Sequence, residues 1–68
     1  MHDVMKALDT LQMHDLFGDA SREDLIAAIA VIEPIASGRV ENRTGAAQSF
    51  MREIVQNALD DVVWMSRG

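Results

Sequence analysis

The sequence predicts a small all-α fold in which three helices form a single domain over residues 1–68. Three observations favour this fold class. Apolar residues recur at intervals of three or four over most of the chain, which is the period of one helix face. Ala, Leu, Ile, Val and Met supply nearly all of them, whereas sheets favour aromatic residues, here one tryptophan and two phenylalanines. A serine followed by an acidic turn marks a helix start.

The first helix is expected from about Asp3 to Leu16. Its apolar positions form one stripe at a spacing of three or four: Val4, Met5, Leu8 and Leu11. Gly18 is expected to end this helix, because glycine adopts the left-handed conformation of a helix C-terminus without steric cost.

The second helix is expected to begin at Ser21, whose hydroxyl can accept a hydrogen bond from a free N–H group of the first turn. Glu23 and Asp24 follow in that turn, where negative charge is favourable. The apolar run from Leu25 to Ile32 predicts a helix that is buried on all sides. A buried parallel strand has a similar pattern, but the cap and the alanines within the run favour a helix.

Pro34 interrupts the second helical segment. An internal proline removes one hydrogen bond and clashes with the carbonyl group four residues earlier. The helix is therefore expected either to kink between Ala30 and Glu33 or to end there and resume as one turn. Gly38 is expected to close the segment in both cases.

The third and longest helix is expected to start between Val40 and Thr44, with Asn42 or Thr44 as its cap, and to run to about Ser66. Its apolar residues come in pairs four positions apart, which predicts an apolar face wider than the ~100° stripe of a surface helix. The pairs are Ala46-Ala47, Phe50-Met51, Ile54-Val55, Ala58-Leu59 and Val62-Val63.

A second apolar side on the third helix predicts a helical homodimer. The first two helices can cover only one side, and a chain of 68 residues without cysteine lacks disulfides to support a small core. Two copies packed antiparallel would bury the remaining side. The residues expected in this dimer interface are Met51, Val55, Leu59, Val62 and Val63.

The net charge of −5 favours a basic partner protein, for example a DNA-binding protein, over nucleic acid or an anionic membrane surface. Acidity is concentrated in the first half of the chain. Tryptophan is enriched where proteins bind one another, although the single Trp64 is equally expected to cap the small core. The residues expected to contact this partner are Asp15, Asp19, Glu23, Asp24 and Trp64. We therefore expect a small regulator or inhibitor that binds proteins.

Two other functions have some support. Arg39, Arg43 and Arg52 surround the start of the third helix, as in a helix-turn-helix regulator that binds DNA, although the net charge opposes this alternative. Small accessory proteins of phages and plasmids, which act as subunits of larger complexes, often have this size and composition.

Catalysis and metal binding have little support in the sequence. Cysteine and a G-x-S-x-G motif are absent, so we expect neither an enzyme nor a cofactor. His14, Asp15, Asp19 and Glu23, with His2 further away, are potential metal ligands, but their spacing matches no known loop or histidine pair. A solvated acidic loop is the favoured interpretation.

The cytoplasm is the expected location. The longest apolar run has about eight residues, whereas a membrane-spanning helix needs about 20. The first residues, Met1-His2-Asp3, also lack the basic start of a secretory signal.

Overall fold

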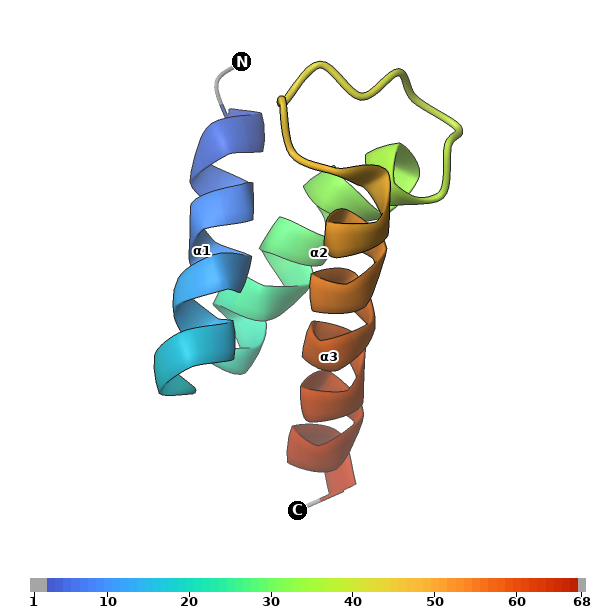
Figure 1. Ribbon diagram of the computed structural model, residues 1–68. Coiled ribbons are helices and arrows are strands. Elements are labelled where there is room, and N and C mark those ends of the chain that lie inside the picture. Colours follow the sequence, from blue (N-terminus) through green and yellow to red (C-terminus); the bar gives the residue numbers. More distant parts are fainter. Residues whose placement is uncertain (1–2, 68) are drawn as a thin grey trace.

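The computed structural model describes residues 3–67, which form three helices and no strand. These are α1 (Asp3–Phe17), α2 (Arg22–Ala36) and α3 (Gln48–Arg67). In Figure 1, α1 and α3 run in the same direction, and α2 runs back between them and behind them. The predicted three-helix, all-α fold is therefore confirmed. None of the helices within residues 3–67 has the length and hydropathy needed to cross a membrane.

The first helix has nearly the bounds expected from its apolar spacing. Ala7, Leu8 and Leu11 lie in the core, and Val4 packs against it. The helix ends at Phe17, where Gly18 has a positive φ of 66° and its N–H group donates to the carbonyl oxygen of residue 14 at 2.7 Å. The predicted stop at Gly18 is confirmed.

The second helix begins and ends with the expected caps. The Ser21 hydroxyl accepts a hydrogen bond from the Asp24 N–H group at 3.1 Å, so the predicted N-cap is confirmed. The helix does not end before Pro34 but continues to Ala36. Gly38 (φ 89°) then donates to the carbonyl oxygen of residue 35, and Arg39 donates to that of Pro34, which is the hydrogen-bond pattern of a Schellman motif.

The prediction that the second helix is buried on all sides is wrong. Leu25 and Ile32 are fully buried between α1 and α3, but Ile26, Ala27 and Ala30 are exposed. Two neighbouring helices can cover only the near side of α2, because no further element lies on its other side within residues 3–67. The core as a whole consists of Ala7, Leu8, Leu11, Leu25, Ala28, Ile32, Ile35, Ala36, Met51, Ile54, Val55 and Ala58.

The third helix begins at Gln48, several residues later than predicted. Asn42 and Thr44 do accept backbone N–H groups, but they stabilise turns of the preceding loop and do not cap α3. The N–H group of Thr44 donates to Asn42 Oδ1 at 3.0 Å, and the N–H group of Ala46 donates to Thr44 Oγ1 at 3.1 Å. The first bond of α3 runs from Met51 N–H to the carbonyl oxygen of Ala47.

Candidate interaction surfaces

The face of α3 predicted to form a dimer interface is divided between the core and the surface. Met51 is 0% exposed and Val55 is buried, so the structure places both inside the domain and not on an uncovered face. Val62 is half-buried and packs against the core. Leu59 (37% exposed) and Val63 (59% exposed) are accessible. The wide apolar face expected from the sequence is thus a buried stripe with an exposed apolar edge.

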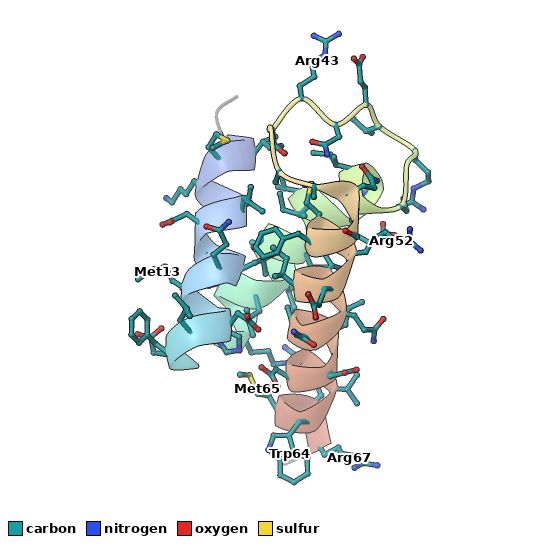
Figure 2. The ribbon with its side chains drawn as sticks, viewed as in Figure 1. Met13, Arg43, Arg52, Trp64, Met65 and Arg67 are labelled. Atoms are coloured by element: carbon teal, nitrogen blue, oxygen red, sulfur yellow. The ribbon has the colours of Figure 1, made fainter. Side chains whose placement is uncertain are left out.

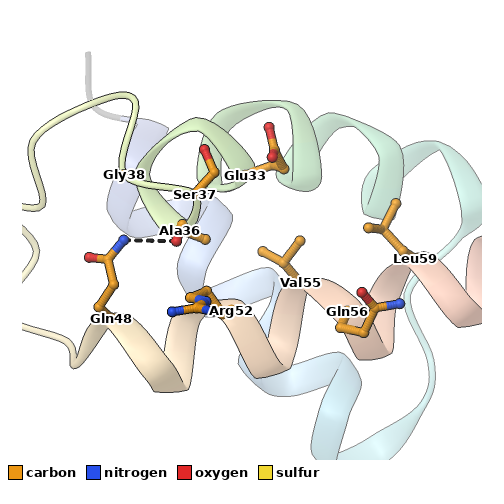
Figure 3. A pocket seen from close by; sticks show the side chains of 9 residues that line it. All are labelled: Glu33, Ala36, Ser37, Gly38, Gln48, Arg52, Val55, Gln56 and Leu59. Atoms are coloured by element: carbon orange, nitrogen blue, oxygen red, sulfur yellow. Dashed lines mark hydrogen bonds between the residues drawn. The ribbon is translucent and has the colours of Figure 1, made fainter.

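The exposed edge of α3 borders a groove between α2 and α3, which Figure 3 shows from close by. Val55 and Leu59 point from α3 toward α2 and form an apolar floor, while Glu33 and Arg52 place opposite charges on the two helices. The residues that line the groove are Glu33, Ala36, Ser37, Gly38, Gln48, Arg52, Val55, Gln56 and Leu59.

Hydrogen bonds at both ends hold α2 and α3 antiparallel beside this groove. At one end, Gln48 Nε2 donates to the carbonyl oxygens of Ile35 and Ala36 at 2.6 and 2.8 Å. These acceptors belong to the last turn of α2, whose carbonyl groups lack partners within the helix. At the other end, Arg22 Nε donates to Ser66 Oγ at 3.0 Å.

Apolar side chains continue along both helices beyond the groove itself. Ile26 and Ala30 precede Glu33 on α2 by seven and three residues, so they lie on the same side of the helix. Val63 follows Leu59 by one turn on α3. We call the surface formed by Ile26, Ala30, Leu59 and Val63 the groove face. Its members are all exposed.

The residues predicted to contact a basic partner are all exposed, but they do not form one patch. Asp15 lies beside α3, where its Oδ1 accepts a hydrogen bond from Asn57 Nδ2 at 3.2 Å. Asp24 instead lines a shallow groove between α1 and α2 with Lys6. Trp64 is 72% exposed and points away from the end of α3, so it does not cover the core (Figure 2). Asp19 and Glu23 lie in and after the turn between α1 and α2.

His14 has a structural role that could not be predicted from the sequence. It is 6% exposed, its Nε2 lies 2.7 Å from Asp61 Oδ2, and its Nδ1 accepts the N–H group of Ala20 at 3.3 Å. An imidazole that accepts at Nδ1 carries its proton at Nε2 and therefore donates to Asp61. The ring thus joins the last turn of α1, the following turn and α3. His14 and Asp61 are 47 residues apart in the sequence, so the spacing of neighbouring residues could not predict their contact.

The structure gives no support to a metal site in the part of the chain it describes. Among residues 3–67, no group of three His, Asp or Glu side chains is arranged to hold a metal ion. His14 uses both ring nitrogens in the contacts with Asp61 and Ala20. His2 lies outside the described residues.

The geometry around the predicted DNA-binding arginines does not favour a helix-turn-helix. The connection between α2 and α3 spans residues 37–47, whereas that motif uses a turn of about three or four residues. Arg39 is paired with Glu33, and Arg43 lies 3.2 Å from Glu41. These pairs reduce the positive potential that a phosphate backbone requires.

Comparison of the chain with protein-family models, with curated proteins and with solved structures finds no match.

Proposed function

We propose that this protein is a small, non-enzymatic regulator or inhibitor that works by binding other proteins and acts as a helical homodimer. The observation that carries the proposal is the groove face, in which Leu59 lines the groove between two antiparallel helices while Ile26 and Val63 are exposed along the same sides of those helices. Contiguous apolar surface of this kind, bordered by polar residues, is typical of sites of protein association.

A second copy of the chain suits the elongated shape of the domain that carries this face. The domain measures 35 × 19 × 19 Å, so its long side offers an area comparable to the roughly 800 Å² per partner of a standard interface. Two such faces packed together would form a four-helix arrangement, with the exposed parts of Leu59 and Val63 buried. Glu33 and Arg52 border the face with opposite charges, so two copies need not repel each other.

The energetic argument concerns the small size of the domain. A chain of 68 residues buries only about 60% of the surface that its unfolded form exposes. Each fully buried Val, Leu or Ile side chain contributes about 1.5–3 kcal/mol, so covering the exposed parts of the groove face in a dimer adds stability that one core does not supply. The excess of acidic residues favours a basic protein, such as a DNA-binding protein, as the further partner.

Light scattering across a hundredfold range of protein concentration tests the homodimer. We expect a mass of twice 7.5 kDa for the unmodified chain and a monomer for Val63→Asp, with unchanged helix content by circular dichroism. Leu16→Asp is the matched control, because Leu16 is 73% exposed on α1 and lies outside the groove face. A monomer at every concentration, or equal dissociation by Leu16→Asp, would refute the proposed dimer.

A further inference from the structure

A second uncovered surface of α3 lies on its other flank, toward α1. Its members follow one another at intervals of three or four residues, apart from two adjacent aspartates, and therefore form a continuous ridge on one side of the helix. We call this surface the aromatic ridge, and it consists of Phe50, Glu53, Asn57, Asp60, Asp61 and Trp64. Two contacts fix its orientation toward α1, from Asn57 to Asp15 and from Asp61 to His14.

The aromatic ridge has apolar ends and an acidic middle. Phe50 is 36% exposed and Trp64 is 72% exposed, so both rings are accessible. They are 14 residues apart, which corresponds to roughly 21 Å along a helix. Every ionisable group on the ridge between them is a carboxylate, and Asp15 of α1 adds another beside Asn57. The ridge therefore combines two apolar anchor points with charge of a single sign.

We propose that the aromatic ridge binds a cationic amphipathic helix of a partner protein. The matching helix has two large apolar side chains about 14 residues apart, at the separation of Phe50 and Trp64, with Lys or Arg between them. Its cations lie against Glu53 and Asp60, and a cation near the Trp64 ring gains a further attraction. This inference specifies the basic partner of the proposed function and depends on its protein-binding part, not on the homodimer.

Charge complementarity selects this occupant over the alternatives. A second copy of the chain would place one acidic ridge against another, and like charges in such an interface cost free energy. Nucleic acid and anionic lipid would meet the same repulsion. The carboxylates of Glu53 and Asp60 remain available to a partner, because neither has a cationic partner among the ion pairs of residues 3–67. Within the described part of the chain, Asp60 accepts a hydrogen bond from the neutral side chain of Gln56 at 3.1 Å.

The test uses a synthetic helical peptide of about 18 residues, built from Lys, Ala and two Leu anchors about 14 residues apart. Trp64 is the single tryptophan of the chain, so its fluorescence reports directly on the ridge. We expect a blue shift on binding and an affinity that falls with added salt. Calorimetry should show about tenfold or greater weakening for Trp64→Ala and for Glu53→Lys/Asp60→Lys.

The matched control is Asp9→Lys/Glu41→Lys, which changes the net charge equally at two exposed positions outside the ridge and outside the residues expected to contact the partner. We expect this variant to bind the peptide within about twofold of the unmodified chain, because exposed charges act over about a Debye length. If both double variants lowered the affinity for the peptide equally, the ridge would be refuted as the binding site, and the peptide would be attracted by net charge alone. Undiminished binding of a peptide whose anchors are about seven residues apart would refute the two-anchor geometry.

The experiments distinguish a wrong proposal about the aromatic ridge from a wrong proposal about the homodimer. Val63→Asp, designed to give a monomer, should bind the peptide as the unmodified chain does, because Val63 is not on the ridge. A dimer that does not bind the peptide would refute the ridge alone. A monomer that binds it would refute the homodimer alone. Circular dichroism of each variant must show unchanged helix content for these comparisons to hold.

Discussion

Met51 is the residue whose substitution best separates the core of α3 from its exposed faces. Its side chain is 0% exposed, and its sulfur accepts a hydrogen bond from Thr44 Oγ1 at 3.6 Å. Met51→Ala removes most of a buried side chain from among α1, α2 and α3, where the neighbouring helices cannot collapse fully into the space. Such substitutions cost about 2–5 kcal/mol, from lost transfer free energy and the remaining cavity.

That cost is large relative to the whole free energy of unfolding. Domains have about 0.05–0.15 kcal/mol per residue, or roughly 3–10 kcal/mol for 68 residues. A loss of about 2 kcal/mol should lower Tm by roughly 8–16 °C in a domain of this size. Met51→Leu nearly conserves the side-chain volume and should cost less than about 1.5 kcal/mol.

Urea unfolding followed by circular dichroism at 222 nm measures these values. Trp64 fluorescence is unsuitable, because the ring is already 72% exposed in the folded chain. The control is Val63→Ala, which should change the free energy of unfolding of the monomer by no more than about 0.5 kcal/mol. A cost below about 1 kcal/mol for Met51→Ala would refute its place in the core. A cost that grows with protein concentration more steeply than that of Val63→Ala would instead place Met51 in a dimer interface.

Three further substitutions test local features by the same unfolding measurement. His14→Ala removes the contact with Asp61 and leaves the Ala20 N–H group without its partner, so it should cost about 1–3 kcal/mol; a cost near zero would show that the ring does not join the helices. Ser21→Ala should cost about 1 kcal/mol and Ser21→Gly only a few tenths, because glycine is a better N-cap than alanine; the reverse order would contradict the cap. Gly38→Ala should cost about 1–2 kcal/mol from its positive φ alone, because an added Cβ meets nothing within 4 Å.

The ends of a helix were predictable from the sequence where a residue type at that position has a single structural role. Ser21 before an acidic turn and Gly18 and Gly38 after apolar runs gave the correct ends of α1 and α2. The start of α3 was not predictable in this way. Asn42 and Thr44 accept backbone N–H groups in loop turns by the same chemistry as in helix caps, so sequence does not distinguish the two uses.

The extent of α2 was not predictable for a related reason. Pro34 lies close to the end of the helix, where it removes only one hydrogen bond, and its carbonyl oxygen accepts the N–H groups of Arg39 and Val40 at 2.9 and 3.0 Å. A proline in the last turn is therefore compatible with a continuous helix to Ala36. The apolar run before it is exposed on one side, because burial depends on the number of neighbouring elements as well as on hydropathy.

The candidate surfaces were predictable only in part, because pairs of apolar residues do not reveal which member faces the core. Ile54 and Val55 are both buried, whereas Leu59 and Val63 are exposed beside Ala58 and Val62. Burial decreases toward the C-terminus because α3 has 20 residues and extends past the ends of α1 and α2 (Figure 1).

The arrangement of α3 allows its two exposed flanks to act at the same time. Successive helix residues point about 100° apart, so Val63 and Trp64 lie on different sides although they are neighbours in sequence. The groove face is apolar with charges of both signs at its border, which suits a second copy. The aromatic ridge carries one sign only, which suits a cationic partner. A homodimer joined through the groove face would therefore carry two outward ridges, and a partner with two cationic helices would bind it more tightly than either helix alone.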